Sequence, residues 1–166
     1  MFRITSTPLD PDALRREMLD LRAGGFVTFE GRVRSRNEGL EVRALEYEAF
    51  RELAEKEGER VLAEARDKFA VLSAACAHRV GTLQLGDLAV WVGVTAEHRA
   101  EAFGACQYII DELKRRVPIW KKEHYATGAS VWVAGRGEAG EPARGIKEKD
   151  KTGAGGQSAR NPGGCG

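Results

Sequence analysis

Several features that mark large classes of proteins are scarce or missing in this chain. Its three cysteines, Cys76, Cys106 and Cys165, lie far apart and form no Cys-x-x-Cys pair, so neither a zinc site nor a disulfide framework is indicated. The formal net charge of +1 lacks the basic excess that a general nucleic-acid-binding protein needs. No apolar run approaches the length of a membrane span, and the N-terminal stretch MFRITSTPLD has no signal-peptide core. We therefore expect a cytoplasmic protein.

Familiar catalytic arrangements are also missing. The sequence offers no Ser-His-Asp set, no phosphate-binding Walker loop and no glycosidase-like pair of carboxylates. The candidate site residues are instead lysine, arginine and histidine, which suit an anionic substrate and acyl or sulfur transfer better than metal-assisted hydrolysis. With 42% hydrophobic residues among 166, the chain is most simply one domain with a substantial core.

The order of the hydrophobic patterns predicts an α+β fold. A short strand is expected at residues 2–5, and a helix from Asp10-Pro11 to Gly24-Gly25, with Leu14, Met18 and Leu21 on its apolar side. Further strands are expected at 26–34, 42–49, 71–80 and 88–95, a long helix with Leu53 on its buried side at 50–69, and a terminal hairpin from 124–125 and 130–134. The glycine-rich residues 138–166 have almost no apolar side chains, so we predict a disordered tail after a domain of residues 1–137.

The stretch from His98 to Glu123 is the centre of the pattern. Val117-Pro118 ends a helix there, because proline disfavours the α conformation in the residue before it. Cations at the C-terminal end of this helix complement its dipole, whereas His98 and Arg99 at its start oppose the dipole unless an anion fills the site. Apolar residues recur along the helix at helical spacing: Ala102, Phe103, Cys106, Ile109, Ile110 and Leu113.

Taken residue by residue, most of the basic candidates have a simple alternative interpretation. Lys114 is a solvated helix-end lysine, unless repulsion from Arg115 and Arg116 favours its neutral amine, which could act as nucleophile or base. Lys121 is a loop lysine whose direction is limited by a packed Trp120, and Lys122 follows it. Arg34 ends the polar face of a strand. The His78-Arg79 pair is interpreted as structural.

Several segments in the right order resemble the large, catalytic subunit of molybdopterin synthase. The resemblance covers roughly residues 25 to 136. Its segments are FEGRVR at 29–34, LEYEAF at 45–50, HRVGTLQLGDLAVWVGVTAEHR at 78–99, HRAEAF at 98–103, LK at 113–114 and PIWKKE at 118–123. It implies an α/β-hammerhead fold and a homodimer at the centre of a heterotetramer, with no metal or cofactor.

The resemblance also implies a reaction. The family enzyme transfers sulfur to cyclic pyranopterin monophosphate and so forms the dithiolene of molybdopterin. The sulfur comes from the C-terminal Gly-Gly thiocarboxylate of a small ubiquitin-like sulfur-carrier subunit. A different interpretation is a non-catalytic module that holds a phosphorylated ligand with the same basic residues and regulates a partner.

The family's functional positions can be carried over to this sequence. By resemblance, Lys114 and Lys121 would be catalytic, working at the thiocarboxylate and at the pterin carbons that accept sulfur. Arg34, His98 and Arg99 would hold the phosphate and the pterin, with Lys122 as a further substrate-binding candidate. Gly163-Gly164 is similar to the partner's terminus, but no ubiquitin-like domain precedes it, so we do not expect a fused sulfur carrier.

Overall fold

The computed structural model describes residues 1–134, which form an α+β arrangement, as the sequence predicts. The predicted tail at 138–166 and the end of the predicted domain lie outside the described residues. The elements are β1 (Phe2–Thr5), α1 (Pro11–Arg16), β2 (Gly25–Arg32), β3 (Arg36–Asn37), β4 (Leu40–Ala49), α2 (Arg51–Phe69), β5 (Ser73–Arg79), β6 (Gly81–Gln84), β7 (Leu88–Ala96), α3 (Arg99–Arg116), β8 (Ile119–Tyr125) and β9 (Ser130–Ala134).

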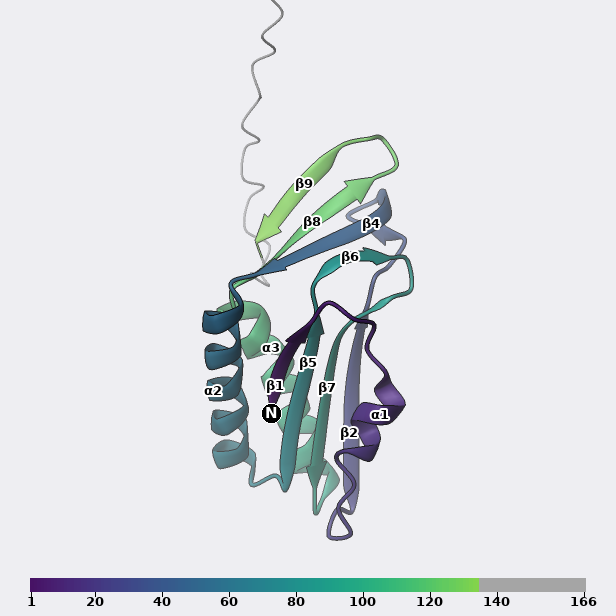
Figure 1. Cartoon of the computed structure of the whole chain (residues 1–166). Coiled ribbons are helices and arrows are strands. Elements are labelled where there is room, and N and C mark those ends of the chain that lie inside the picture. The colour runs from purple at the N-terminus through teal and green to yellow at the C-terminus, as the bar shows by residue number, and fades with distance from the viewer. Residues whose placement is uncertain (135–166) are drawn as a thin grey trace, which may run out of the picture.

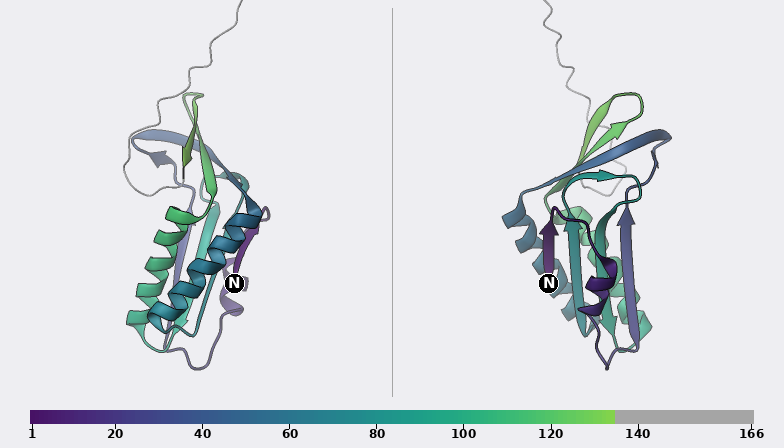
Figure 2. Two further views of the ribbon diagram at one scale, coloured as in Figure 1. Left: turned by 90° about the vertical axis from the view of Figure 1, so that its left-hand side faces the viewer. Right: turned by 45° about the vertical axis from the view of Figure 1, so that its right-hand side comes forward.

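The larger body is a four-stranded sheet with strand order β1-β5-β7-β2, covered by helices (Figure 1). β1 runs parallel to β5, and the other neighbours are antiparallel. All nine residues of β7 are buried, which confirms that it is a central strand. Val90, Val92 and Val94 pack under α2 and α3, whereas Trp91 packs with α1 on the opposite face of the sheet (Figure 2).

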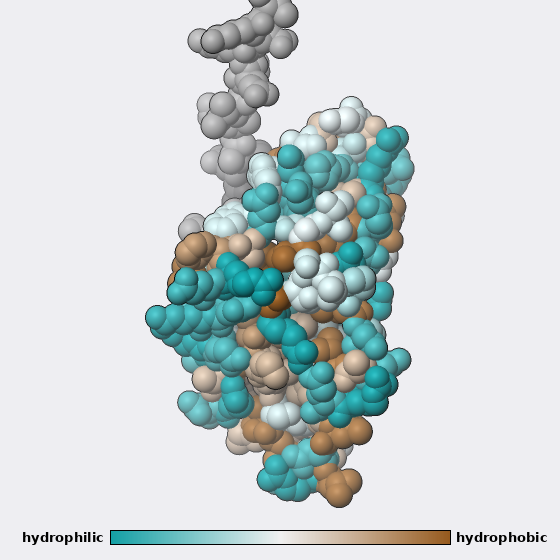
Figure 3. All heavy atoms as spheres, viewed as in Figure 1, coloured by the Kyte–Doolittle hydropathy of each residue, from teal (hydrophilic) through white to brown (hydrophobic). Residues whose placement is uncertain are grey.

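The long helix α2 approaches the sheet closely because residue 58 is glycine. A Cβ atom at Gly58 would lie 2.3 Å from a ring carbon of Phe2 on β1, a distance that side chains do not tolerate. Its outer faces carry mainly charged residues, and hydrophilic side chains gather over α2 on the surface (Figure 3). Among residues 1–134, none of the helices combines the length and the apolarity needed to span a membrane.

A second sheet lies across one end of the first (Figure 1). Its strand order is β3-β4-β8-β9, and β6 pairs with β4. β4 leads directly into α2, and β8 follows α3 after the Val117-Pro118 break, so both long helices start or end at this sheet. The predicted terminal hairpin is confirmed but is longer than expected, because β8 begins at Ile119 rather than at His124.

Three apolar residues that the patterns placed in the core are exposed instead. The first helix ends at Arg16, well before Gly24, so Leu21 lies in the following loop with its side chain fully exposed. Leu53 on α2 and Phe103 on α3 are 48% and 63% exposed. Leu21 is exposed because the helix ends before it. For Leu53 and Phe103, helical spacing alone did not distinguish exposed from buried apolar residues.

Candidate active site

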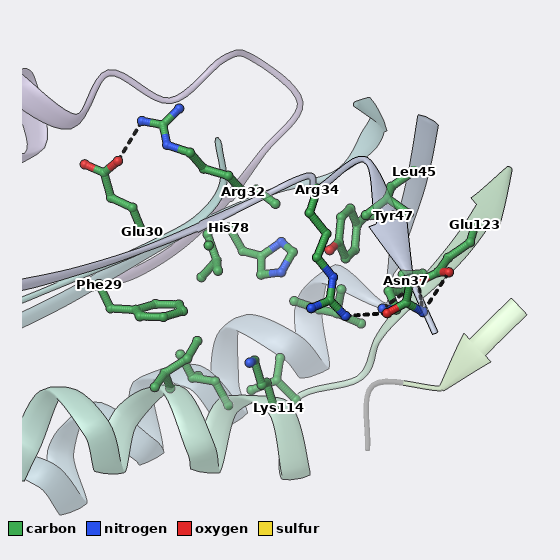
Figure 4. Close-up of a pocket in the computed structure, with 18 of the residues that line it drawn as sticks. Phe29, Glu30, Arg32, Arg34, Asn37, Leu45, Tyr47, His78, Lys114 and Glu123 are labelled. Carbon is green, nitrogen blue, oxygen red and sulfur yellow. Dashed lines mark hydrogen bonds and ion pairs between the residues drawn. The ribbon is translucent and has the colours of Figure 1, made fainter. Parts of the chain in front are cut away.

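The sheet junction encloses a cavity of about 550 Å³ that opens beside the C-terminal end of α3. Its walls come from β2, β4, β5, α3 and β8, which are distant in sequence. Apolar side chains such as Phe29, Leu45 and Leu113 line much of it, while basic side chains enter from several sides (Figure 4). An apolar cleft with a few convergent polar groups is the usual form of a ligand site.

Lys114 reaches this cavity from the last turn of α3. Ile110 and Leu113 on the same helix are buried, which fixes the position of the backbone from which the Lys114 side chain extends. The Lys114 ammonium lies 5.8 Å from the centre of the Phe29 ring, within the range of a cation–π contact. In the described part of the chain, no carboxylate lies within ion-pairing distance of Lys114, which leaves its amine available to a ligand.

The arginines that follow Lys114 are engaged elsewhere. Arg115 pairs with Glu112 at 2.5 Å, and Arg116 pairs with Glu57 and Glu64 on α2, each at 2.5 Å. Acidic residues therefore offset the charges of both arginines, which the sequence pattern indicated only as sources of repulsion for Lys114. Arg116 instead joins α3 to α2.

Lys121 enters the cavity from β8 and pairs with Glu123, two residues further along the same strand. The Lys121 Nζ lies 2.8 Å from Glu123 Oε1, and the Glu123 side chain is only 1% exposed. Asn37 donates to both carboxylate oxygens of Glu123 at 3.1 and 3.0 Å, and the Tyr125 hydroxyl donates to one of them. Burial opposes ionisation of Glu123, but these donors outweigh it, so the pKa of Glu123 lies below its ordinary value.

The direction of Lys121 comes from strand pairing and not from a packed tryptophan. Lys121 pairs with Tyr47 on β4, in the middle of a long antiparallel ladder. Trp120, which the sequence suggested would pack and so orient Lys121, is 42% exposed. Successive residues of a strand point to opposite faces, which sends Lys121 and Glu123 to the cavity and Trp120 away from it.

Lys122 lies outside the cavity within this chain. The same alternation turns its side chain to the other face of β8, where its ammonium lies 5.5 Å from the centre of the Trp132 ring.

Arg34 lines the cavity from the segment between β2 and β3. Backbone hydrogen bonds fix this segment on both sides: Val33 donates to Asp87 at 3.0 Å, and Val42 donates to Ser35 at 2.9 Å. The Arg34 guanidinium donates to the Asn37 side chain, whose amide donates in turn to Glu123. Arg34 is thus linked through Asn37 to Glu123 (Figure 4), the carboxylate that pairs with Lys121.

His98 and Arg99 lie at the opposite end of α3 from Lys114. His98 is the residue before the first turn, and both side chains are exposed. Fifteen residues of helix separate Arg99 from Lys114, a rise of about 22 Å. A single chain therefore brings together Arg34, Lys114 and Lys121, but not the His98-Arg99 pair.

His78 is one of the cavity residues whose place the sequence did not reveal. It lies near the end of β5 and lines the cavity, with its ring edge-on to Tyr47 at 5.1 Å between ring centres. Burial lowers the pKa of His78 to about 4, partly opposed by a hydrogen bond to a backbone carbonyl. The neighbouring Arg79 does not line this cavity and pairs with Asp87. A His-Arg pair at a strand end was the signal, but the pattern could not show which face His78 occupies.

Comparison with known proteins shows which family the chain resembles. Residues 4–116 match the family described as "MoaE protein". The molybdopterin synthase catalytic subunit of Thermoplasma volcanium is 42% identical over 129 residues, which cover 78% of this chain and 94% of that protein. Molybdopterin synthase catalytic subunit 1 of Mycobacterium tuberculosis is 42% identical over 134 residues, covering 81% and 90% of the two chains.

The chain belongs to the MoaE family. The resemblance inferred from the sequence motifs is thereby confirmed. Among solved structures, molybdopterin synthase from Staphylococcus aureus superimposes with a TM-score of 0.74 at 35% identity, covering 78% of this chain and 94% of that one. The MoaE protein from Burkholderia ambifaria superimposes with a TM-score of 0.70 at 34% identity, covering 81% and 89%. The MoaE fold thus extends over nearly all of the described residues.

Proposed function

We propose that this chain is the catalytic subunit of a molybdopterin synthase and acts as a sulfurtransferase in the cytoplasm. Its substrate is cyclic pyranopterin monophosphate, and its sulfur donor is the C-terminal Gly-Gly thiocarboxylate of a small ubiquitin-like subunit. The observation that carries the proposal is the convergence of Arg34, Lys114 and Lys121 on one apolar-walled cavity. Family membership supplies the reaction.

The charges of the cavity suit both reactants. A thiocarboxylate and a phosphate are anions, and the cationic groups of Arg34, Lys114 and Lys121 provide the opposite charge for charge-assisted hydrogen bonds. Glu123, the buried carboxylate of the cavity, is already occupied by Lys121, Asn37 and Tyr125, so it repels an incoming anion less than a free carboxylate would. The planar Arg34 guanidinium suits a phosphate oxygen pair.

We assign the chemical steps to the two lysines. Lys114 is anchored by a buried helix face, and among the described residues no carboxylate pairs with it, so it is suited to attack on the thiocarboxylate carbon or to proton transfer with the thiocarboxylate group. Lys121 is held by Glu123 and is suited to orient the pterin carbons that accept sulfur. Both sulfurs of the dithiolene would be delivered in this cavity. In each transfer a carbon–sulfur bond would form to the pterin and the carbon–sulfur bond of the thiocarboxylate would break. An oxygen from water or from the displaced substrate oxygen would replace the sulfur and leave a carboxylate on the small subunit.

His98 and Arg99 fit this site only if a second copy of the chain supplies them. In a two-fold dimer each copy would present the start of its α3 to the other copy's cavity. Phe103, one turn into the same helix, is 63% exposed and would be available to such a contact. We therefore propose that the homodimer expected from the family completes the anion site and forms the centre of a heterotetramer with two small subunits.

A subunit-mixing experiment tests this arrangement. Arg99→Ala and Lys114→Ala homodimers should each be inactive. If Arg99 acts across the dimer, random exchange makes mixed dimers with one intact site, and about one quarter of wild-type activity should return. Mixed dimers that stay inactive would place Arg99 in its own chain's site, and an active Arg99→Ala homodimer would place it outside the site.

The proposed function is tested by reconstitution. Purified chain, thiocarboxylated small subunit and cyclic pyranopterin monophosphate should together yield a dithiolene product, measured by mass spectrometry or by an oxidised fluorescent derivative. A carboxylate-terminated small subunit should yield none. Tight binding of the phosphorylated pterin without any product would instead support the non-catalytic binding module.

A further inference from the structure

His78 is a titratable residue in the cavity for which the sulfur-transfer scheme has no use. It lies at the end of β5, where its backbone pairs with Val90 on β7 and with Ile4 on β1. Its ring points into the cavity on the side opposite Lys114 (Figure 4). Tyr47 contacts the ring edge-on, so the imidazole is held in one orientation.

The hydrogen bond at Nδ1 determines which ring nitrogen carries the proton. Nδ1 lies 2.9 Å from the backbone carbonyl oxygen of Arg79. A carbonyl oxygen can only accept, so Nδ1 must donate and carries the proton. Burial lowers the pKa of His78 to about 4, which keeps the ring neutral at physiological pH. Nε2 is then an unprotonated acceptor, and it has no hydrogen-bond partner in the described part of the chain.

Within the described residues, the carboxylate and amide side chains of the cavity already accept hydrogen bonds. Glu30 accepts from Arg32 at 2.6 Å, and the side-chain oxygen of Asn37 accepts from Arg34. Glu123 accepts from several donors, as described above. The basic side chains are donors, and a phosphate would satisfy them. His78 Nε2 is therefore poised to accept from a ligand group that the lysines and arginines cannot serve.

We propose that His78 recognises the heterocycle of the substrate, with Nε2 accepting a hydrogen bond from a ring or exocyclic N–H group of the pterin. This inference rests on the proposed function and adds to it the basis on which the cavity distinguishes a pterin from other phosphorylated molecules. Phe29 and Tyr47 contribute two aromatic rings to the cavity wall, which suits a planar ligand ring. His78 thus recognises the pterin ring, while Arg34 and the lysines bind the anionic groups of the ligand.

Two variants separate this role from a structural one. His78→Gln can return an amide oxygen near the Nε2 position, whereas His78→Phe keeps a ring but has no acceptor. His78→Phe should weaken binding of cyclic pyranopterin monophosphate about five- to tenfold, the loss expected for one neutral hydrogen bond, and His78→Gln should recover most of it. Affinity for inorganic pyrophosphate should be unchanged in both variants. His124→Gln, on the outer face of β8, is the matched control and should bind like wild type.

A spectroscopic measurement on the wild-type chain avoids any dependence on folding of the variants. With ¹⁵N-labelled histidine, His78 should show a protonated Nδ1 and an unprotonated Nε2. The Nε2 resonance should move when the pterin substrate binds and should stay in place with pyrophosphate. An unmoved Nε2 resonance at saturating substrate, or His78→Phe binding as tightly as wild type, would overturn the role of His78 and leave the proposed function standing. Failure of the wild-type chain to bind the substrate would overturn both.

Discussion

Lys121 and Glu123 face the same cavity from one strand, with the lysine ammonium 2.8 Å from a carboxylate that is almost completely buried. A carboxylate in that position would be costly without partners, and the ion pair with Lys121 together with hydrogen bonds from Asn37 and Tyr125 compensates. The pair thus fixes the position of one proposed catalytic group and ties it to Arg34 through Asn37.

Replacing Glu123 with Gln should damage both stability and substrate handling. The change keeps the size of the side chain but removes the charge that holds Lys121. We expect a loss of about 1.5–3 kcal/mol in the free energy of unfolding, typical of hydrogen bonds to a charged group, and a marked fall in turnover. Chemical denaturation and steady-state kinetics would measure the two effects.

Glu46→Gln is the matched control for Glu123→Gln. Glu46 lies on β4 in the same sheet and pairs with His124 on the outer face at 3.5 Å, with 34% of its side chain exposed. Such a pair is worth about 0–1 kcal/mol at most, so stability and turnover should stay near wild type. Equal effects of the two substitutions would show that the buried network has no special role.

The sequence predicted the candidate site only as far as local patterns reach. Lys114 could be placed because the helix periodicity and the Val117-Pro118 break define its position at the end of α3. The residue pattern did not separate Lys121 from Lys122, because the stretch after Pro118 was interpreted as a loop, and only the family resemblance distinguished the two. Once β8 is known to start at Ile119, strand alternation separates the two lysines at once.

Glu64 on α2 predicts how the stability of the contact between α2 and α3 depends on pH. Its hydrogen bonds from Arg116 on α3 lower the pKa of Glu64 to about 2, against an ordinary value of 4.5. A lowered pKa contributes stability above the ordinary value, and that contribution is lost as pH falls through the native pKa. Glu64→Gln should therefore lower the melting temperature at pH 7, and the difference from wild type should shrink between about pH 4.5 and pH 2.

Glu52→Gln provides the comparison for this titration. Glu52 is exposed in the first turn of α2, and no cation of the described residues pairs with it. The melting temperature of the Glu52→Gln variant should follow that of wild type from pH 7 to pH 2. A constant difference between Glu64→Gln and wild type from pH 7 to pH 2 would mean that the Arg116 pair does not act through the charge of Glu64.

Gly58→Ala should destabilise the fold although alanine favours helices. The helix propensity gained is about 1 kcal/mol. The added Cβ would lie 2.3 Å from the Phe2 ring, and overpacking of this kind costs about 1–3 kcal/mol. We therefore expect a lower melting temperature by scanning calorimetry. Phe2→Leu removes the opposing ring. The double variant Gly58→Ala/Phe2→Leu should therefore lose less stability than the two single substitutions added together. Strict additivity would contradict the close contact.

The parts of the site that the sequence missed depend on tertiary structure. His78 and Tyr47 lie on different sheets, and only the junction of those sheets places them together. His98 and Arg99 were correctly placed at the start of a helix, but the helix then separates them from Lys114. Spacing along a chain predicts which face of an element a residue occupies, whereas the distance between elements comes from packing.

The central claim is that Lys114 performs chemistry in this cavity, and single-turnover product formation with excess thiocarboxylated small subunit tests it most directly. Lys114 is exposed at the end of α3, so Lys114→Ala should fold, dimerise and still bind the small subunit, yet form little or no dithiolene. Lys114→Arg should fail nearly as badly, because arginine keeps the charge but cannot give up its proton. Lys56→Ala, on the exposed face of α2, should react like wild type. Near-normal product with Lys114→Arg would contradict the claim, leaving Lys114 as a positioning charge and Lys121 as the reactive lysine.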